Sequence, residues 1–147
     1  MATRSCIAVR TGSTRSPRYL GVYCHWDGYP DHQLPILTQH HNSPAKALAL
    51  IAPGDISSLR TGTTWQPGAP RSPQPLYYAE RGDKDIAPRE FTEVQRLLDH
   101  FQGMGCEHAY VFTPKLGWVH TDLRQLDLPF EDPDPEDPNW VGSPIHY

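Results

Sequence analysis

Residues 5–26, SCIAVRTGSTRSPRYLGVYCHW, decide the fold because they place two alternating segments on either side of a turn. In the first segment, SCIAVR, Ile7 and Val9 share one face of an extended chain, opposite to Cys6. The middle segment, TGSTRSPR, is made of residues that favour turns, and YLGVYCHW alternates again. The second strand has two faces, which carry Leu20, Val22, Cys24 and Trp26 on one side and Tyr19, Tyr23 and His25 on the other. The stretch therefore predicts a β-hairpin.

Two segments after the hairpin have the pattern of helices. Residues 43–54 place Ser43 at the N-cap and Pro44 in the first helical position, and they end at a Pro-Gly pair. Residues 32–41 predict a shorter helix whose first turn tolerates Pro35, because early backbone N–H groups have no partner within a helix.

The second half of the chain predicts one strong helix and further strands. Residues 87–105 carry an apolar stripe at helical spacing that ends at Gly103 and is formed by Phe91, Val94, Leu98 and Phe101. The segment PLYYAE resembles a strand, and residues 108–123 predict two short strands around a Pro-Lys-Leu-Gly turn.

These elements predict an α+β fold, in which a small, mostly antiparallel sheet of four or five strands packs with two or three helices. At 147 residues the chain has the length of one domain, which we expect over residues 1–126. Residues 62–75, rich in Gly, Pro, Ser and Thr, predict a surface loop or insertion, and residues 127–147 an acidic, proline-rich tail.

Charge and apolar content restrict the partners. The net charge is −4, yet residues 127–147 hold six acidic groups and no Lys or Arg, so the preceding chain carries +2. So little positive charge, without a recognisable binding motif, argues against double-stranded DNA. The sequence shows no signal peptide and no apolar run of about 20 residues, and its three cysteines form no CxxC pair. We therefore expect a cytoplasmic protein with reduced thiols and no membrane contact.

Four motifs occur here in the order of a known family: VYCHWDGYP, GDISSL, YYAERGD and AYVFTPKLGWVH. Together with the opening MATRS, they make the chain similar to a family of small phage and prophage proteins. The resemblance covers residues 1 to about 121 and departs from the family in the insertion after Arg60 and in the acidic tail. It implies a phage-encoded accessory protein in the host bacterial cytoplasm, and it supplies neither an activity nor a catalytic residue.

The spacing of the histidines and cysteines does not fit a metal site. Imidazoles and a thiol gather at Cys24, His25, His32, His40 and His41, but they lack the paired spacing typical of zinc sites. We therefore expect a buried cysteine and surface histidines, with no metal and no cofactor.

A catalytic triad of Cys24, His25 and Asp27 is also disfavoured, because neighbours along a strand point to opposite faces. Two carboxylate pairs, Asp27 with Asp31 and Asp83 with Asp85, occur in segments typical of turns. We expect no catalytic residue.

The same region suits recognition. Trp26 and Tyr29 offer flat faces for stacking on a nucleobase, and His25 and Asp27 offer hydrogen bonds to base edges or ribose. Phosphate would be held by basic side chains, for which the candidates are Arg4, Arg60, Arg81 and Lys84. The alternative is structural: Trp26 packs in the core, Gly28 permits a tight turn, and Arg81 pairs with Asp83 or Glu80 on the surface.

The leading hypothesis is therefore a counter-defence protein that sequesters a nucleotide-derived immune signal, of the cyclic oligonucleotide or cyclic ADP-ribose type, without cleaving it. We expect a homo-oligomer, because pockets that enclose small ligands often form between subunits. Two alternatives stay open: a protein inhibitor whose acidic surface occupies a host immune effector or nuclease, and a hydrolase of the signal.

Overall fold

The computed structural model describes residues 2–13, 15–59, 76–78 and 86–125. The expectations for the loop at 62–75 and the tail at 127–147 fall outside these residues. Within them, no helix is long and apolar enough to cross a membrane.

The predicted hairpin is confirmed. Strand β1 (Ser5–Gly12) pairs antiparallel with β2 (Pro17–Trp26), in a register that runs from Ser5 opposite Cys24 to Gly12 opposite Pro17. Gly12 has a φ of 80°, and a Cβ there would lie 2.4 Å from the carbonyl oxygen of Ser16. The tight turn between the strands therefore requires glycine.

The sheet has the order β4-β3-β2-β1-β6-β7, and β5 pairs with Tyr19–Gly21 of β2, along the same edge that β3 joins nearer the end of that strand. Its other strands are β3 (Ile56–Ser58), β4 (Leu76–Tyr77), β5 (Arg89–Phe91), β6 (His108–Thr113) and β7 (Gly117–Asp122). Among the described residues, four of the six strand pairings are antiparallel, and β1–β6 and β2–β3 are parallel. The α+β fold is thus confirmed. Among the described residues the sheet has seven strands instead of four or five. Strand β4 lies in the predicted PLYYAE segment, whereas β3 and β5 are not predicted because three residues each are too few to show alternation.

Three helices complete the described fold: α1 (Pro30–His40), α2 (Pro44–Ile51) and α3 (Val94–Gly103). Helix α2 begins as predicted, with the Ser43 hydroxyl accepting a hydrogen bond from the backbone N–H of Lys46 at 3.1 Å. Two details of the prediction are wrong. Helix α1 begins earlier, so Pro35 lies inside the helix and not in its first turn. Phe91 belongs to β5, because pairing with Tyr19 of β2 outweighs its helical spacing.

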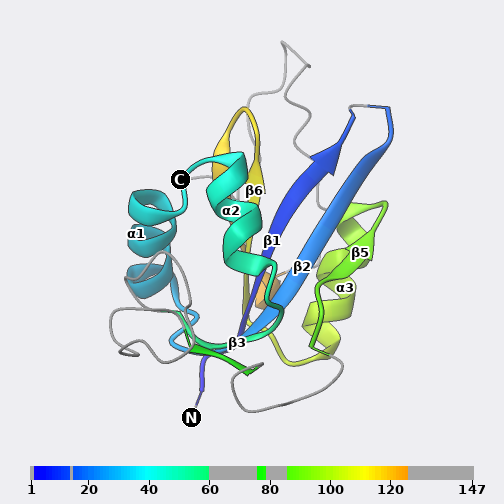
Figure 1. The fold of residues 1–147 in the computed structure, drawn as a ribbon. Coiled ribbons are helices and arrows are strands. Elements are labelled where there is room, and N and C mark those ends of the chain that lie inside the picture. The colour runs from blue at the N-terminus through cyan, green and yellow to red at the C-terminus, as the bar shows by residue number, and fades with distance from the viewer. Residues whose placement is uncertain (1, 14, 60–75, 79–85, 126–147) are drawn as a thin grey trace.

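The helices cover both faces of the sheet, with α1 and α2 on one side and α3 on the other (Figure 1). Ile7, Val9 and Val22 pack beneath α1 and α2, whereas Cys6 and Tyr19 pack beneath α3. The alternation predicted for the hairpin is therefore correct, and it divides the core into two layers. One end of the sheet brings together the start of β1, the end of β2 and the loop into α1, and this end carries the candidate site.

Candidate functional site

The loop between β2 and α1, residues 27–29, lies so close to the residues at the start of β1 that its backbone conformation is restricted. Asp27 has a left-handed φ of 56°, a conformation that Asp tolerates better than most residues. A Cβ at Gly28 would lie 2.7 Å from the carbonyl oxygen of Thr3 and 2.8 Å from the Cβ of Ser5. The Asp-Gly pair is therefore needed to bring the loop this close to the start of β1.

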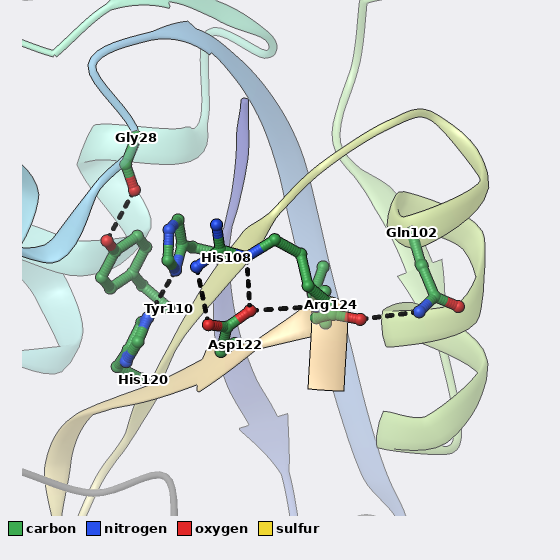
Figure 2. Close-up of polar contacts among 8 residues, drawn as sticks. Gly28, Gln102, His108, Tyr110, His120, Asp122 and Arg124 are labelled. Carbon is green, nitrogen blue, oxygen red and sulfur yellow. Dashed lines mark hydrogen bonds and ion pairs between the residues drawn. The ribbon is translucent and has the colours of Figure 1, made fainter. Parts of the chain in front are cut away.

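Two hydrogen bonds hold the loop in place. The backbone N–H of Gly28 donates to the carbonyl oxygen of Thr3 at 2.8 Å. The carbonyl oxygen of Gly28 accepts a buried hydrogen bond of 2.6 Å from the phenol of Tyr110 on β6 (Figure 2). The loop is thus fixed to segments on either side of it, which is how a rigid scaffold presents a recognition loop.

Behind Tyr110 lies a buried pair of imidazoles that the sequence analysis did not identify. Figure 2 shows His120 beside the Tyr110 ring, with ring centres 5.1 Å apart, and His108 next to it. His108 Nδ1 and His120 Nε2 are 2.9 Å apart. Burial is the main cause that lowers the pKa of both, and the neighbouring His108 helps lower that of His120 to about 4. In the hairpin of β6 and β7, Tyr110 lies opposite His120 and His108 shares their face of the sheet. Pairing the two predicted strands in this register would have identified the cluster from the sequence.

The two aromatic residues on either side of Asp27 and Gly28 have exposed side chains. Trp26 is 46% exposed and Tyr29 is 43% exposed. The alternative interpretation of Trp26 as a core residue is therefore wrong: Trp26 is the last residue of β2, beyond the packed part of that strand. The structure thus gives both predicted stacking residues open surface within one short segment.

His25 lies against this surface. Its ring meets the indole of Trp26 edge-on, with centres 4.7 Å apart, and its Nδ1 is 2.6 Å from the phenol oxygen of Tyr23. The pKa of His25 is lowered, first by burial and then by the positive charge of Arg4. Asp27 is exposed next to it in the chain. The predicted residues His25, Trp26, Asp27, Tyr29 and Arg4 therefore gather at one end of the sheet.

The other predicted phosphate ligands, Arg60, Arg81 and Lys84, lie outside the described residues. Arg4 is exposed and precedes β1, and its Nη1 donates to the carbonyl oxygen of Met104 at 3.5 Å. A cation is therefore present beside the aromatic loop.

The thiols have the wrong environment for nucleophilic catalysis. Cys24 is fully buried, accepts a hydrogen bond from Nε2 of Gln33 at 3.1 Å, and has its pKa raised to about 11, mainly by burial. Cys6 and Cys106 are also buried free thiols with raised pKa values. A reactive thiol needs access and a lowered pKa, so none of the three fits that role.

The histidines that the structure describes do not gather into a metal-binding group. His32 Nε2 contacts the carbonyl oxygen of Leu59 at 2.9 Å, and His41 is fully buried, contrary to the expectation of a surface histidine. In the part of the chain that the structure describes, no group of three or more His, Cys, Asp or Glu side chains is placed to hold a metal ion.

A hollow of about 650 Å³ lies between α1 and β7. It is lined by Pro30, Asp31, Leu34, Pro35, Thr38, Gln39 and Trp118, and none of these is a predicted site residue. The predicted stacking residues Trp26 and Tyr29 lie on exposed surface outside this hollow.

Comparison with protein-family models, curated proteins and solved structures finds no match to this chain, so its own geometry has to define the site.

Proposed function

We propose that the protein binds a nucleotide-derived signalling molecule at residues 25–29, which comprise the end of β2 and the loop that follows it, and sequesters it without cleaving it. One observation carries the proposal: Trp26 and Tyr29 stay nearly half exposed on either side of a loop backbone that is held by two hydrogen bonds. Stacking of a base on such a ring contributes about 1–3 kcal/mol.

The chemistry of the surroundings favours binding over turnover. Within the described chain the thiols are buried and protonated, and the side chains at the loop offer stacking faces, a carboxylate, an imidazole and a guanidinium. Such groups recognise the base, the ribose and the phosphate of a nucleotide. Recognition by these groups requires no general base.

The biological role that we propose is based on the sequence resemblance to small phage and prophage proteins. A phage protein that holds a cyclic oligonucleotide or cyclic ADP-ribose signal in the host cytoplasm would silence the immune response that depends on it. Because the loop is open in one copy, we propose that a second copy covers the ligand in a homo-oligomer, as enclosure increases the buried ligand surface.

The proposal is tested by retention of intact ligand. The full-length protein is incubated with a panel of cyclic dinucleotides and cyclic ADP-ribose isomers, freed of unbound ligand and heat-denatured, and the released compounds are identified by chromatography. We expect one panel member to be recovered intact, near one equivalent per site. Cleaved product formed in excess over the protein would show a hydrolase, and no retention by the folded protein would contradict the proposal for these signals.

A truncated chain distinguishes nucleotide binding from the alternative of an acidic protein inhibitor, by its retention of nucleotide and its suppression of host immunity. A chain that lacks residues 127–147 should retain the nucleotide as the full chain does. Loss of immune suppression by that truncated chain, with no nucleotide bound by either form, would favour the inhibitor.

A further inference from the structure

Tyr23 and His25 form a hydrogen bond at the end of β2. They are two residues apart on β2 and therefore share the face of the sheet that α3 covers. The phenol oxygen and Nδ1 are 2.6 Å apart, and the tautomer of the ring decides which of the two donates. Burial raises the pKa of Tyr23 to about 12, so the phenol keeps its proton at neutral pH and is able to donate. In the tautomer with hydrogen on Nε2, Tyr23 donates and Nδ1 of His25 accepts.

A donating Tyr23 phenol favours one tautomer of His25. A neutral imidazole that accepts at Nδ1 carries its hydrogen on Nε2. The lowered pKa of His25 keeps the ring neutral at pH 7. Among the described residues, Nε2 has no hydrogen-bond partner, so an N–H donor remains available next to the indole of Trp26.

Arg4 is held beside this donor by the turn between α3 and β6. Its carbonyl oxygen accepts from the backbone N–H of Glu107 at 2.8 Å, and its Nη1 donates to Met104. Gly105, which has a φ of 89°, lies in this turn, and a Cβ there would come within 2.7 Å of Nη1, so the guanidinium rests against the turn. The antiparallel register that sets Ser5 opposite Cys24 brings Arg4, one residue before β1, to the level of His25 at the end of β2. In agreement with this, the charge of Arg4 contributes to lowering the pKa of His25.

Arg4 is also available for an external anion. Its side chain is exposed, and no carboxylate among the described residues forms an ion pair with it. Guanidinium groups bind phosphate oxygens through charge-assisted hydrogen bonds.

We propose that Arg4 and the Nε2–H of His25 form a phosphate subsite beside the stacking face of Trp26, with Tyr23 as the positioning residue that fixes the His25 tautomer. The inference rests on the proposed function and refines it. The ligand is a nucleotide whose base stacks on Trp26 while a phosphodiester or pyrophosphate group lies between Arg4 and His25.

The tautomer is tested on the ligand-free, full-length protein by nitrogen NMR of labelled histidines. We expect His25 to be neutral with hydrogen on Nε2 at pH 7, and Tyr23→Phe to give a mixture of tautomers. Tyr77→Phe is the matched control, because it removes a buried phenol hydrogen bond to the carbonyl oxygen of Leu50 on the opposite face of the sheet. A wild-type His25 that carries its hydrogen on Nδ1, or is charged, would overturn the role of Tyr23.

The subsite itself is tested with inorganic pyrophosphate, and adenosine serves as a base probe without phosphate. Pyrophosphate should shift the His25 Nε2 and Arg4 Nε signals saturably, and Arg4→Gln should weaken this binding at least tenfold. No saturable shift with pyrophosphate, while adenosine perturbs the Trp26 indole N–H, would overturn the subsite and leave the proposed function standing. No response to either probe, together with no retention of the nucleotide panel, would overturn both.

Discussion

At the scale of single residues, the sequence VYCHWDGYP divides into positions that build the loop and positions that the loop displays. Gly28 permits the close approach to the start of β1, and Cys24 fills the core. Trp26 and Tyr29 are the positions left at the surface. The motif therefore contains residues that build the loop and aromatic residues that the fold leaves exposed. We expect substitution of the first group to reduce stability and substitution of the second group to reduce binding.

Gly28→Ala should destabilise the protein, because the new methyl group would meet the backbone of Thr3, which has little freedom to move. We expect a loss of about 1–3 kcal/mol in the free energy of unfolding, measured by urea denaturation. Gly103→Ala is the matched control, because a Cβ at the end of α3 would have no neighbour within 4 Å. It should be neutral or slightly stabilising. Equal stability of the two variants would contradict the account of Gly28.

At the scale of elements, the sequence predicts the helices and strands whose signals lie within a few neighbouring residues. The hairpin follows from alternation and a turn, and α2 from its serine cap, since both signals lie within a few residues. Strand β5 was missed because it forms by pairing with β2 far away in the chain, and Phe91 fits a helical stripe equally well. The aromatic loop could be identified as a candidate site, but the support from Tyr110 and the role of Tyr23 depend on distant contacts and on side-chain geometry.

Strand β5 is joined to the rest of the sheet by a polar contact that also explains the GDISSL motif. The carboxylate of Asp55 accepts from the backbone N–H of Tyr23 at 2.9 Å and forms an ion pair with Arg89 on β5. Gly54 has a φ of 102° and lies against the carbonyl group of Ile86. This motif is therefore structural and supports the strand that carries Tyr23 and His25.

Asp55→Asn should destabilise the protein by about 1.5–3 kcal/mol, because a half-buried Arg89 would lose its charged partner. Glu90→Gln is the control, since the Arg18–Glu90 pair is exposed and such pairs contribute about 0–1 kcal/mol. Chemical denaturation of both variants checks this. A loss for Asp55→Asn no larger than that for Glu90→Gln would show that β5 is held by other contacts.

At the scale of the whole molecule, the recognition loop and the far edge of the sheet are connected through buried polar groups. Tyr110 on β6 holds the Gly28 carbonyl, and His120 on the edge strand β7 lies against the Tyr110 ring (Figure 2). Because both imidazoles behind the loop are kept neutral by burial, the stability of this region depends on pH.

The sign of the dependence follows from the lowered pKa values. The unfolded chain binds protons at His108 and His120 near pH 6.5, before the folded protein does, so stability is full above that pH and falls below it. For His120, with a pKa of about 4, the loss reaches about 3 kcal/mol near pH 4. The carboxyl of Asp122, whose pKa is lowered to about 2 chiefly by a hydrogen bond from Arg124, acts only at lower pH.

Thermal unfolding between pH 7.5 and 4.5 should therefore show a falling midpoint, and His120→Gln should flatten the slope. His25 also has a lowered pKa and contributes in the same direction, so the slope should not vanish. A wild-type midpoint that rises as the pH falls through this range would contradict the buried neutral pair.

The central claim is that the exposed aromatic loop is the binding surface, and the most direct measurement is the affinity of Trp26→Ala for the nucleotide that the wild-type protein retains. Calorimetric titration of the full-length variant should show binding about 5–150-fold weaker, as loss of one stacking contact of about 1–3 kcal/mol implies. Leu48→Ala, which alters another exposed apolar side chain on α2, should bind as the wild type does. A folded Trp26→Ala protein with wild-type affinity would contradict the claim.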